Sequence, residues 1–348
     1  MRSFSLLLLA SAAWAQSQPG ILLRQTFTGD TSGWMARGQG GSVRAAAGTL
    51  EFDYQVRPNQ LAMALLPAPP ETARLQRLRL RLKTDHDTAV AVLLSEKKPG
   101  GGSYVANFWA PSGAWQTVEL APADFAAADG PNDPIDSNGR LDLDQVEGIA
   151  IIDLASFFAA LPENPDFPVM RIPASGSHTL QLGEFTMLSG DPVPAPAALS
   201  IDHFDRGFLQ WMTPGGMKLK IAGSENPLHE AAMEVNYEQA QGHFGLLLRR
   251  LANVDLARAT GIAFDIASRT DTTVVVSLEL KDGKRFHQTI YPPAEREVFH
   301  VQLKFSDFEG NGKLDPTQLK SILLADVSAA DGGGSANTLW LGKVEGVR

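Results

Sequence analysis

Hydrophobic and polar residues alternate with a period of two along much of the chain. In 50–56, apolar residues alternate with Glu51, Asp53 and Gln55. The same alternation recurs at 78–82, 233–237, 262–266 and 274–280. A period of two is typical of a strand with one buried and one solvated face. We therefore expect short antiparallel strands, separated by Gly, Pro, Asn and Asp turns, that form an all-β sandwich of two packed sheets.

The strand pattern occurs twice. Residues 87–94 (Asp-Thr-Ala-Val-Ala-Val-Leu-Leu) match 271–278 (Asp-Thr-Thr-Val-Val-Val-Ser-Leu), an offset of 271 − 87 = 184 residues. Further along, Thr179–Gly183 matches Thr338–Gly342 as Thr-Leu-x-Leu-Gly. Each copy has the size of one domain, so the repeat predicts two β-sandwich domains in tandem.

The ends of the two copies define the expected domain organisation. We predict one domain at 21–190 and the other at 200–348, joined by a Pro/Ala linker at 191–199 whose alternating prolines favour an extended spacer. Residues 1–15 have a basic start, a short apolar run and an Ala-Trp-Ala end, which is typical of a cleaved signal peptide. The chain is therefore expected to be secreted or periplasmic.

Composition narrows the class of partner. The formal net charge is −9, which argues against nucleic acid, because affinity for phosphates requires an excess of Lys and Arg. There is no Cys, which excludes a disulfide framework and thiol catalysis. The chain also lacks a run of eighteen apolar residues, so we expect no membrane span.

The order of these segments resembles a known superfamily. Each copy opens near a Trp (Trp34 or Trp211), continues through Leu-Glu-Phe-Asp-Tyr or Met-Glu-Val-Asn-Tyr, and closes with the Thr-Leu-x-Leu-Gly strand. This order resembles the galactose-binding-like β-jelly-roll domains, in particular family-eleven-type carbohydrate-binding modules and the thirty-kilodalton complex I intermediate-associated protein family. The resemblance implies a non-catalytic carbohydrate-binding protein that takes a polysaccharide or oligosaccharide. The alternative that it implies is a structural or assembly module for a protein partner.

Five residues are candidates for touching the sugar. A sugar site combines polar hydrogen-bonding groups with an aromatic plate. In the second copy, Arg285, His287 and Tyr291 share one strand face, and in the first copy Asn107 and Trp109 do so. We predict that these side chains line the ligand face of each domain.

No organic cofactor is expected, and structural calcium is the one metal that the sequence suggests. Asp307, Glu309, Asn311 and Asp315 have the spacing of a calcium loop, but Gln318 stands where a bidentate Glu belongs. The related families often place a calcium-holding Asp in the closing strand. Here the first copy has Glu184 after the Gly at that place, and the second copy has Lys instead.

Two further features bear on activity. Glu51-x-Asp53 is similar to the acid motif of laminarinase-type glycoside hydrolases, yet the place of the acid/base residue holds Val56. We therefore predict no enzyme activity. The first copy also carries an apolar insertion at 155–178, which is expected to cover either the other domain or a ligand face.

Overall fold

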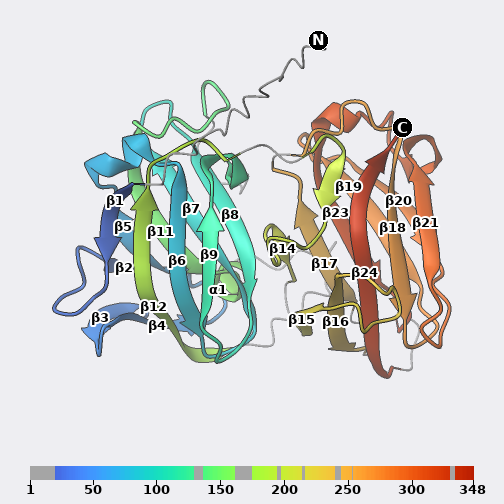
Figure 1. The fold of residues 1–348 in the computed structure, drawn as a ribbon, viewed down its shortest axis with the longest axis horizontal. Helices are drawn as coiled ribbons and strands as arrows, with labels where there is room; N and C mark the ends of the chain where they lie inside the picture. The colour runs from blue at the N-terminus through green and yellow to red at the C-terminus, as the bar shows by residue number, and fades with distance from the viewer. Residues whose placement is uncertain are drawn as a thin grey trace, which may run out of the picture.

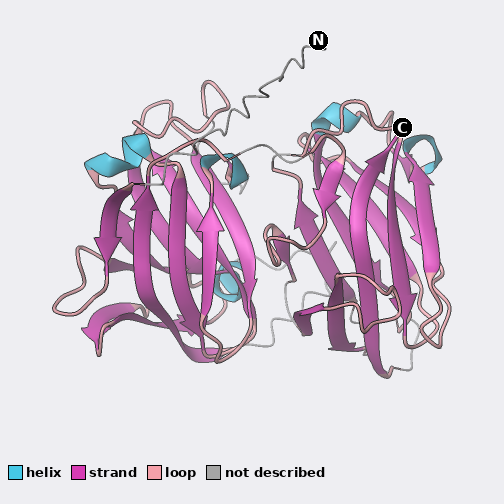
Figure 2. Ribbon diagram, in the orientation of Figure 1, coloured by secondary structure: helices cyan, strands magenta, loops and turns pink. Residues whose placement is uncertain are grey.

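A computed structural model describes residues 20–128, 136–160, 175–193, 197–213, 216–239, 244–252, 254–329 and 334–348. Four six-stranded antiparallel sheets form two sandwiches that stand side by side (Figures 1 and 2). The predicted fold class, two tandem β-sandwich domains, is confirmed.

The first sandwich contains two sheets with strand orders β3-β4-β12-β6-β9 and β10-β8-β7-β11-β5-β2, and β1 pairs with β12. Its strands are β1 (Ile21–Gln25), β2 (Met35–Gly38), β3 (Ser42–Ala46), β4 (Thr49–Val56), β5 (Ala62–Pro67), β6 (Arg77–Thr84), β7 (Thr88–Glu96), β8 (Ser103–Ala110), β9 (Gln116–Leu120), β10 (Ala126–Ala127), β11 (Val146–Asp153) and β12 (Gly176–Leu188). Its helices are η1 (Pro70–Arg74), η2 (Pro122–Asp124) and α1 (Leu154–Ala160).

The second sandwich repeats this plan, with orders β15-β16-β24-β18-β21 and β14-β17-β23-β19-β20-β22, and β13 pairs with β24. Its strands are β13 (Ser200–Asp202), β14 (Trp211–Met212), β15 (Met217–Ala222), β16 (Ala232–Glu238), β17 (Gly245–Arg250), β18 (Gly261–Ser268), β19 (Val274–Leu280), β20 (Arg285–Ile290), β21 (Phe299–Lys304), β22 (Glu309–Gly310), β23 (Leu319–Asp326) and β24 (Ala336–Val347). Its helices are η3 (Phe305–Asp307) and η4 (Pro316–Gln318).

All strands of one sandwich lie within 21–190 and all those of the other within 200–348. The exact domain boundaries stay a prediction. The proposed signal peptide and residues 194–196 of the linker lie outside the described residues.

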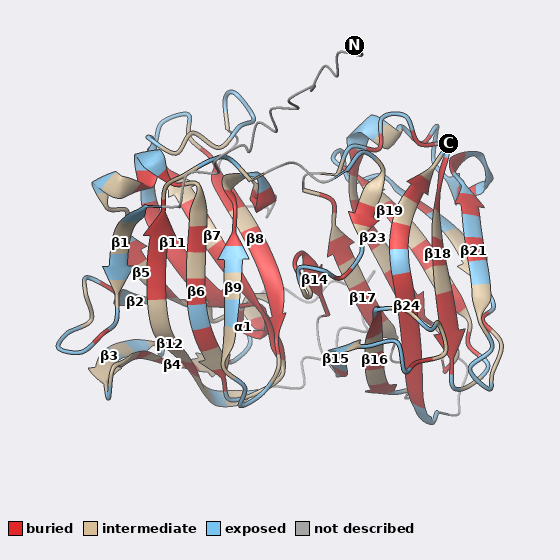
Figure 3. Ribbon diagram, viewed as in Figure 1, coloured by how far each residue is buried: buried red, intermediate tan, exposed pale blue. Residues whose placement is uncertain are grey.

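Alternation along each strand places the core. Phe52 and Tyr54 of β4 are almost completely buried between the sheets, whereas Glu51 and Asp53 point to the outer face. Figure 3 shows the resulting buried bands along the strands. Each buried side chain of this size stabilises the fold by roughly 1.5–3 kcal/mol relative to exposure.

The strand register confirms the internal repeat. On β12, Leu180 pairs with Thr84 and His178 with Tyr54. On β24, Leu339 pairs with Ser268 and Asn337 with Tyr237. Each position of one copy can therefore be compared with its counterpart in the other, for example His178 with Asn337.

The two sandwiches meet at β8, along the part of its outer side that the short strand β10 leaves unpaired. There the backbone N–H of Gln210 donates to the carbonyl of Asn107 at 2.6 Å, and Phe108 forms a β-bridge with Leu209. Nearby, Arg206 donates two hydrogen bonds to Asp124, at 2.8 and 2.7 Å. The segment before β14 thus extends the sheet of the first domain by one short rung of pairing.

Of the apolar insertion, the structure describes 175–178 at the start of β12 and 155–160 within helix α1. Helix α1 contacts β7, β11 and β4 of its own domain. Phe157 and Phe158 pack edge to face, with ring centroids 5.7 Å apart, and lie against a hydrophobic cluster that both domains share. Helix α1 therefore covers its own sandwich and also borders the contact between the domains, and 161–174 lie outside the described residues.

Candidate functional site

The register relates the predicted ligand residues of the two copies. Ala89 pairs with Trp109 in β7–β8, and the position equivalent to Trp109 in the second copy is Tyr291, which follows β20. By the same register, Asn107 corresponds to Thr289 and not to His287. The two predicted faces are therefore equivalent at the aromatic position only.

The predicted ligand residues of the first domain are buried. Asn107 is 0% and Trp109 is 3% exposed, and Trp109 belongs to a hydrophobic cluster that includes Trp211 and Met212 of the second domain. The amide of Asn107 donates to the carbonyl of Trp211 at 3.0 Å. The structure therefore places both side chains in the contact between domains and not on a solvated ligand face.

The predicted ligand residues of the second domain are exposed. Tyr291 is 67% exposed, and the side chains of Arg285 and His287 are 47% and 54% exposed. Arg285 forms an ion pair at 3.3 Å with Glu279 of β19, and His287 lies 3.7 Å from Glu309 of β22. This surface, hereafter the β20 face, combines an aromatic ring with charged hydrogen-bonding groups.

The four residues of the calcium-like turn do not converge. The carboxylate of Asp315 caps η4 by accepting from the backbone N–H of Thr317 at 2.9 Å, and Asp307 accepts from Ser306 at 2.8 Å. Glu309 lies beside His287, as described above. Among the described residues, the one group of His, Cys, Asp or Glu side chains close enough to hold a metal ion lies elsewhere and contains none of Asp307, Glu309, Asn311 and Asp315. Glu184 is likewise engaged, with Arg24 at 3.1 Å and Thr186 at 2.7 Å.

Glu51 and Asp53, the two acids that resemble a hydrolase motif, form ion pairs with Arg44 on the outer face of β4. Glu51 pairs with Arg44 and accepts from Gln181 at 2.9 Å. The hydrogen bond from Arg44 lowers the pKa of Glu51, whereas a general acid needs a raised one. Val56, at the place of the missing acid, is buried.

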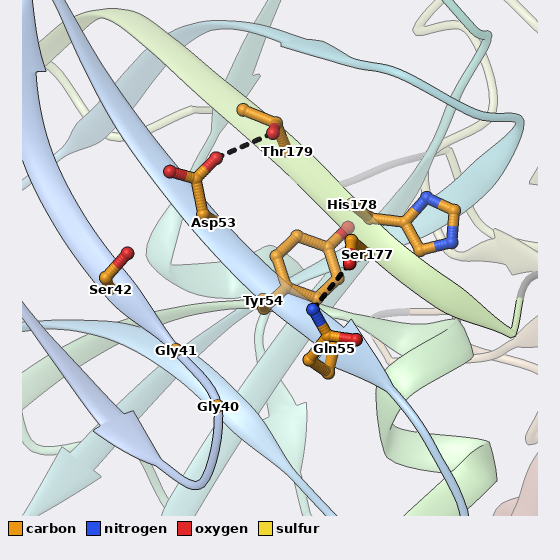
Figure 4. A pocket seen from close by; sticks show the side chains of 9 residues that line it. All are labelled: Gly40, Gly41, Ser42, Asp53, Tyr54, Gln55, Ser177, His178 and Thr179. Atoms are coloured by element: carbon orange, nitrogen blue, oxygen red, sulfur yellow. Dashed lines mark hydrogen bonds between the residues drawn. The ribbon is translucent and has the colours of Figure 1, made fainter.

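A shallow polar pocket of about 460 Å³ lies beside this motif (Figure 4). Two hydrogen bonds cross it: Thr179 to Asp53 at 2.7 Å, and Gln55 to Ser177 at 2.6 Å. Its other lining residues are Gly40, Gly41, Ser42, Tyr54 and His178. Tyr54 is almost fully buried, so the pocket offers no exposed aromatic plate.

One cluster was missed by sequence reasoning. Asp85 and His86 follow β6, and His178 lies near the start of β12. Oδ1 of Asp85 lies 2.8 Å from Nδ1 of His86 and 3.2 Å from Nδ1 of His178. The centroids of the two imidazole rings are 3.9 Å apart. Asp85 and His86 are adjacent, but His178 follows Asp85 by 93 positions, so no local spacing signals the cluster.

The carboxylate of Asp153, which is fully buried, lies behind His86 of this cluster. Nε2 of His86 lies 3.0 Å from Oδ2 of Asp153, an ion-pair contact whose direction falls short of a good hydrogen bond. Asp153 also accepts from Tyr54 at 2.6 Å and from Thr88 at 2.5 Å. Burial alone would raise the pKa of Asp153, but His86, Thr88 and Tyr54 together lower it. Burial opposes the charged form of His86, yet Asp153 and Asp85 raise its pKa.

Comparison with known proteins gives structural neighbours only. No family model matches the sequence, and no curated protein matches it. A family 11 carbohydrate-binding module from Clostridium thermocellum, in complex with a β-1,3-1,4-mixed-linked tetrasaccharide, has 19% identity and a TM-score of 0.34, and the match covers 44% of this chain and 97% of that one. The tandem of two family 22 modules from Paenibacillus barcinonensis Xyn10C has 11% identity and a TM-score of 0.30, and covers 96% of this chain and 100% of that one. An exo-β-agarase has 13% identity and a TM-score of 0.35, over 44% of this chain and 25% of that one.

No helix in the described part of the chain combines the length and the apolar character that crossing a membrane requires.

Proposed function

We propose that the chain is an exported, non-catalytic carbohydrate-binding protein that holds a polysaccharide or oligosaccharide on the β20 face of its second domain. The observation that carries the proposal is the contrast at one equivalent position. Trp109 is buried in the contact between domains, whereas Tyr291 is exposed, and by strand alternation it lies on the same side of β20 as the exposed Arg285 and His287. Tyrosine is enriched at binding surfaces, because its ring is apolar while its hydroxyl can stay hydrated.

The β20 face suits an extended sugar chain. From Arg285 to Tyr291 the extended backbone makes six residue-to-residue steps, or about 20 Å at roughly 3.3 Å per residue. The phenol ring can cover the C–H face of one sugar unit, while Arg285, His287 and Glu279 offer donors and acceptors to hydroxyl groups. An open face of this kind leaves much of the ligand in water, so we expect affinities of about millimolar to micromolar, or roughly 4–8 kcal/mol.

The proposal is tested by retention of the chain on immobilised polysaccharides, after a glycan array has selected the sugar. Tyr291→Ala should reduce retention at least tenfold and leave the melting midpoint nearly unchanged, because an exposed ring contributes little to the core. His300→Gln, an exposed histidine on β21 outside the β20 face, is the matched control and should be retained like the parent chain. Retention of the Tyr291→Ala protein at the parent level would remove the support for this site.

Absence of catalysis is part of the proposal. The side chains of Glu51 and Asp53 form ion pairs with Arg44, and the hydrogen bond from Arg44 lowers the pKa of Glu51. A retaining glycosidase needs two carboxyl groups about 5 Å apart with different protonation states. Release of reducing sugar from a β-glucan that disappears in a Glu51→Gln protein would contradict this part.

A protein partner is the second candidate, and the edge of β20 favours it. One side of β20 pairs with β19 along its length. On the opposite side, β22 pairs with Phe286 and His287 only, and among the described residues no segment pairs there with Gln288–Ile290. At the equivalent edge of β8, the segment before β14 supplies that pairing. Addition of a strand to a free sheet edge is a common way to bind a peptide. Retention on polysaccharide that is insensitive to Tyr291→Ala, together with a partner whose binding is lost on Thr289→Pro, would favour this candidate.

A further inference from the structure

The Asp85–His86–His178 cluster combines ligand types that together suit a particular class of metal. One carboxylate and two imidazoles form a common donor set for zinc and similar divalent transition metals, whereas calcium prefers oxygen ligands alone. We propose that Asp85, His86 and His178 form a binding site for one divalent transition metal ion of the zinc class.

The distances fit such an ion with little rearrangement. Zinc bound tetrahedrally at 2.0–2.2 Å holds its ligand atoms about 3.3 Å apart. Oδ1 of Asp85 is already 2.8 and 3.2 Å from the two Nδ1 atoms, and one ligand atom from each of the three residues lies within 4.8 Å of the others. The side chain of Asp85 is 43% exposed, so a water molecule has access to the fourth position.

Contacts behind the ligands hold them in place. Oδ2 of Asp85 accepts from the backbone N–H of Thr179 at 2.9 Å, which leaves Oδ1 directed at the imidazoles. The second nitrogen of His86 faces the buried Asp153, and a carboxylate behind a metal-bound histidine is a usual feature of such sites. With two carboxylates and two imidazoles, the site has an excess of negative charge when one imidazole is neutral, which favours a cation.

The repeat shows that the fold does not need these residues. The equivalents of Asp85, His86 and His178 in the second copy are Arg269, Thr270 and Asn337. Asn337 closes the same end of the sandwich through neutral hydrogen bonds, to the hydroxyls of Tyr237 at 3.0 Å, Thr272 at 3.1 Å and Ser268 at 3.2 Å. The first copy meets the same structural demand with His178, whose buried Nε2 has no partner among the described residues. Packing alone therefore does not account for the cluster.

The second copy also supplies the variants for a test. The untagged full chain, stripped with a chelator, is titrated with zinc chloride by calorimetry, and with cobalt(II) chloride while visible absorption is followed. We expect one zinc ion per chain, a cobalt spectrum typical of tetrahedral coordination, and a melting midpoint that rises with zinc. His178→Asn and His86→Thr install the residues of the second copy and should weaken zinc binding at least tenfold. His300→Gln removes an exposed histidine that contacts Asp265 at 2.7 Å in the second domain, and should bind zinc like the parent chain.

Several outcomes would overturn the proposal. These are no zinc binding at micromolar protein, zinc binding that a folded His178→Asn protein retains, or equal competition by calcium. If His178→Asn fails to fold, Asp85→Asn gives the same test at a more exposed position, and undiminished zinc binding by it would have the same meaning. Sugar retention is measured on the same samples, so loss of zinc binding and loss of the proposed carbohydrate function are separate results.

Discussion

Replacing Trp109 by alanine separates a core role from a ligand role at this position. Trp109 is 3% exposed and packs with Trp211 and Met212 across the contact between domains. Burying a tryptophan removes roughly 150–250 Å² from water, and truncation to alanine in a packed site typically costs about 3–5 kcal/mol. In a domain of this size each kcal/mol lowers the melting midpoint by about 2–4 °C, so the expected decrease is about 6–20 °C.

The assay is differential scanning calorimetry together with polysaccharide retention at a temperature where both proteins are folded. Retention should not change, because the proposed sugar site lies on the second domain. Trp115→Ala is the matched control in the same domain. Trp115 is half-buried on the outer face, with the guanidinium of Arg81 4.4 Å from its ring centroid, and its loss should cost about 1–2 kcal/mol. The reasoning is refuted if the Trp109→Ala protein melts like the parent chain while its retention is lost.

Three further results are expected. Tyr54→Phe should lower the free energy of unfolding by about 1–3 kcal/mol in urea denaturation, because Asp153 loses a buried hydrogen bond of 2.6 Å; an unchanged midpoint would mean that Asp153 is not ionised or finds another donor. Residues 200–348 expressed alone should unfold cooperatively but less stably than in the full chain, since Arg206 and Gln210 lose their partners in the first domain; a non-cooperative transition would show that the domain boundary or the independence of the domain is wrong. Millimolar calcium should shift the melting midpoint by less than about 2 °C, because Asp307 and Asp315 hydrogen-bond within the protein; a large shift that Asp307→Ala abolishes would restore the calcium site.

Much of the fold could be predicted from sequence because alternation specifies burial directly. In β4 each apolar residue between Glu51 and Val56 enters the core, since successive side chains of a strand point to opposite sheet faces. The second sandwich could be predicted from the repeat, because two segments with the same hydrophobic pattern at a constant offset form equivalent strands.

The site could be predicted only in part, for two physical reasons. Alternation assigns Trp109 to the outer face of β8, but it does not tell whether water or another domain covers that face. The histidine cluster depends on contacts between distant strands, since His178 follows Asp85 by 93 positions. Comparison of the two copies offered the one available signal: where the second copy has the neutral pair Thr270 and Asn337, the first has histidines.

Because the backbone of Gln210 pairs with the edge of β8, the second domain protects the first domain from aggregation through that edge. An uncovered edge strand offers free N–H and C=O groups to any other chain, and natural sheets avoid such edges. Here the backbone carbonyl of Asn107 and the β-bridge at Phe108 are occupied by the protein's own next segment, and Trp109 is covered with them. If proteolysis between the domains let them separate, the unpaired edge of β8 and the apolar ring of Trp109 would be exposed together, and the first domain would become prone to aggregation.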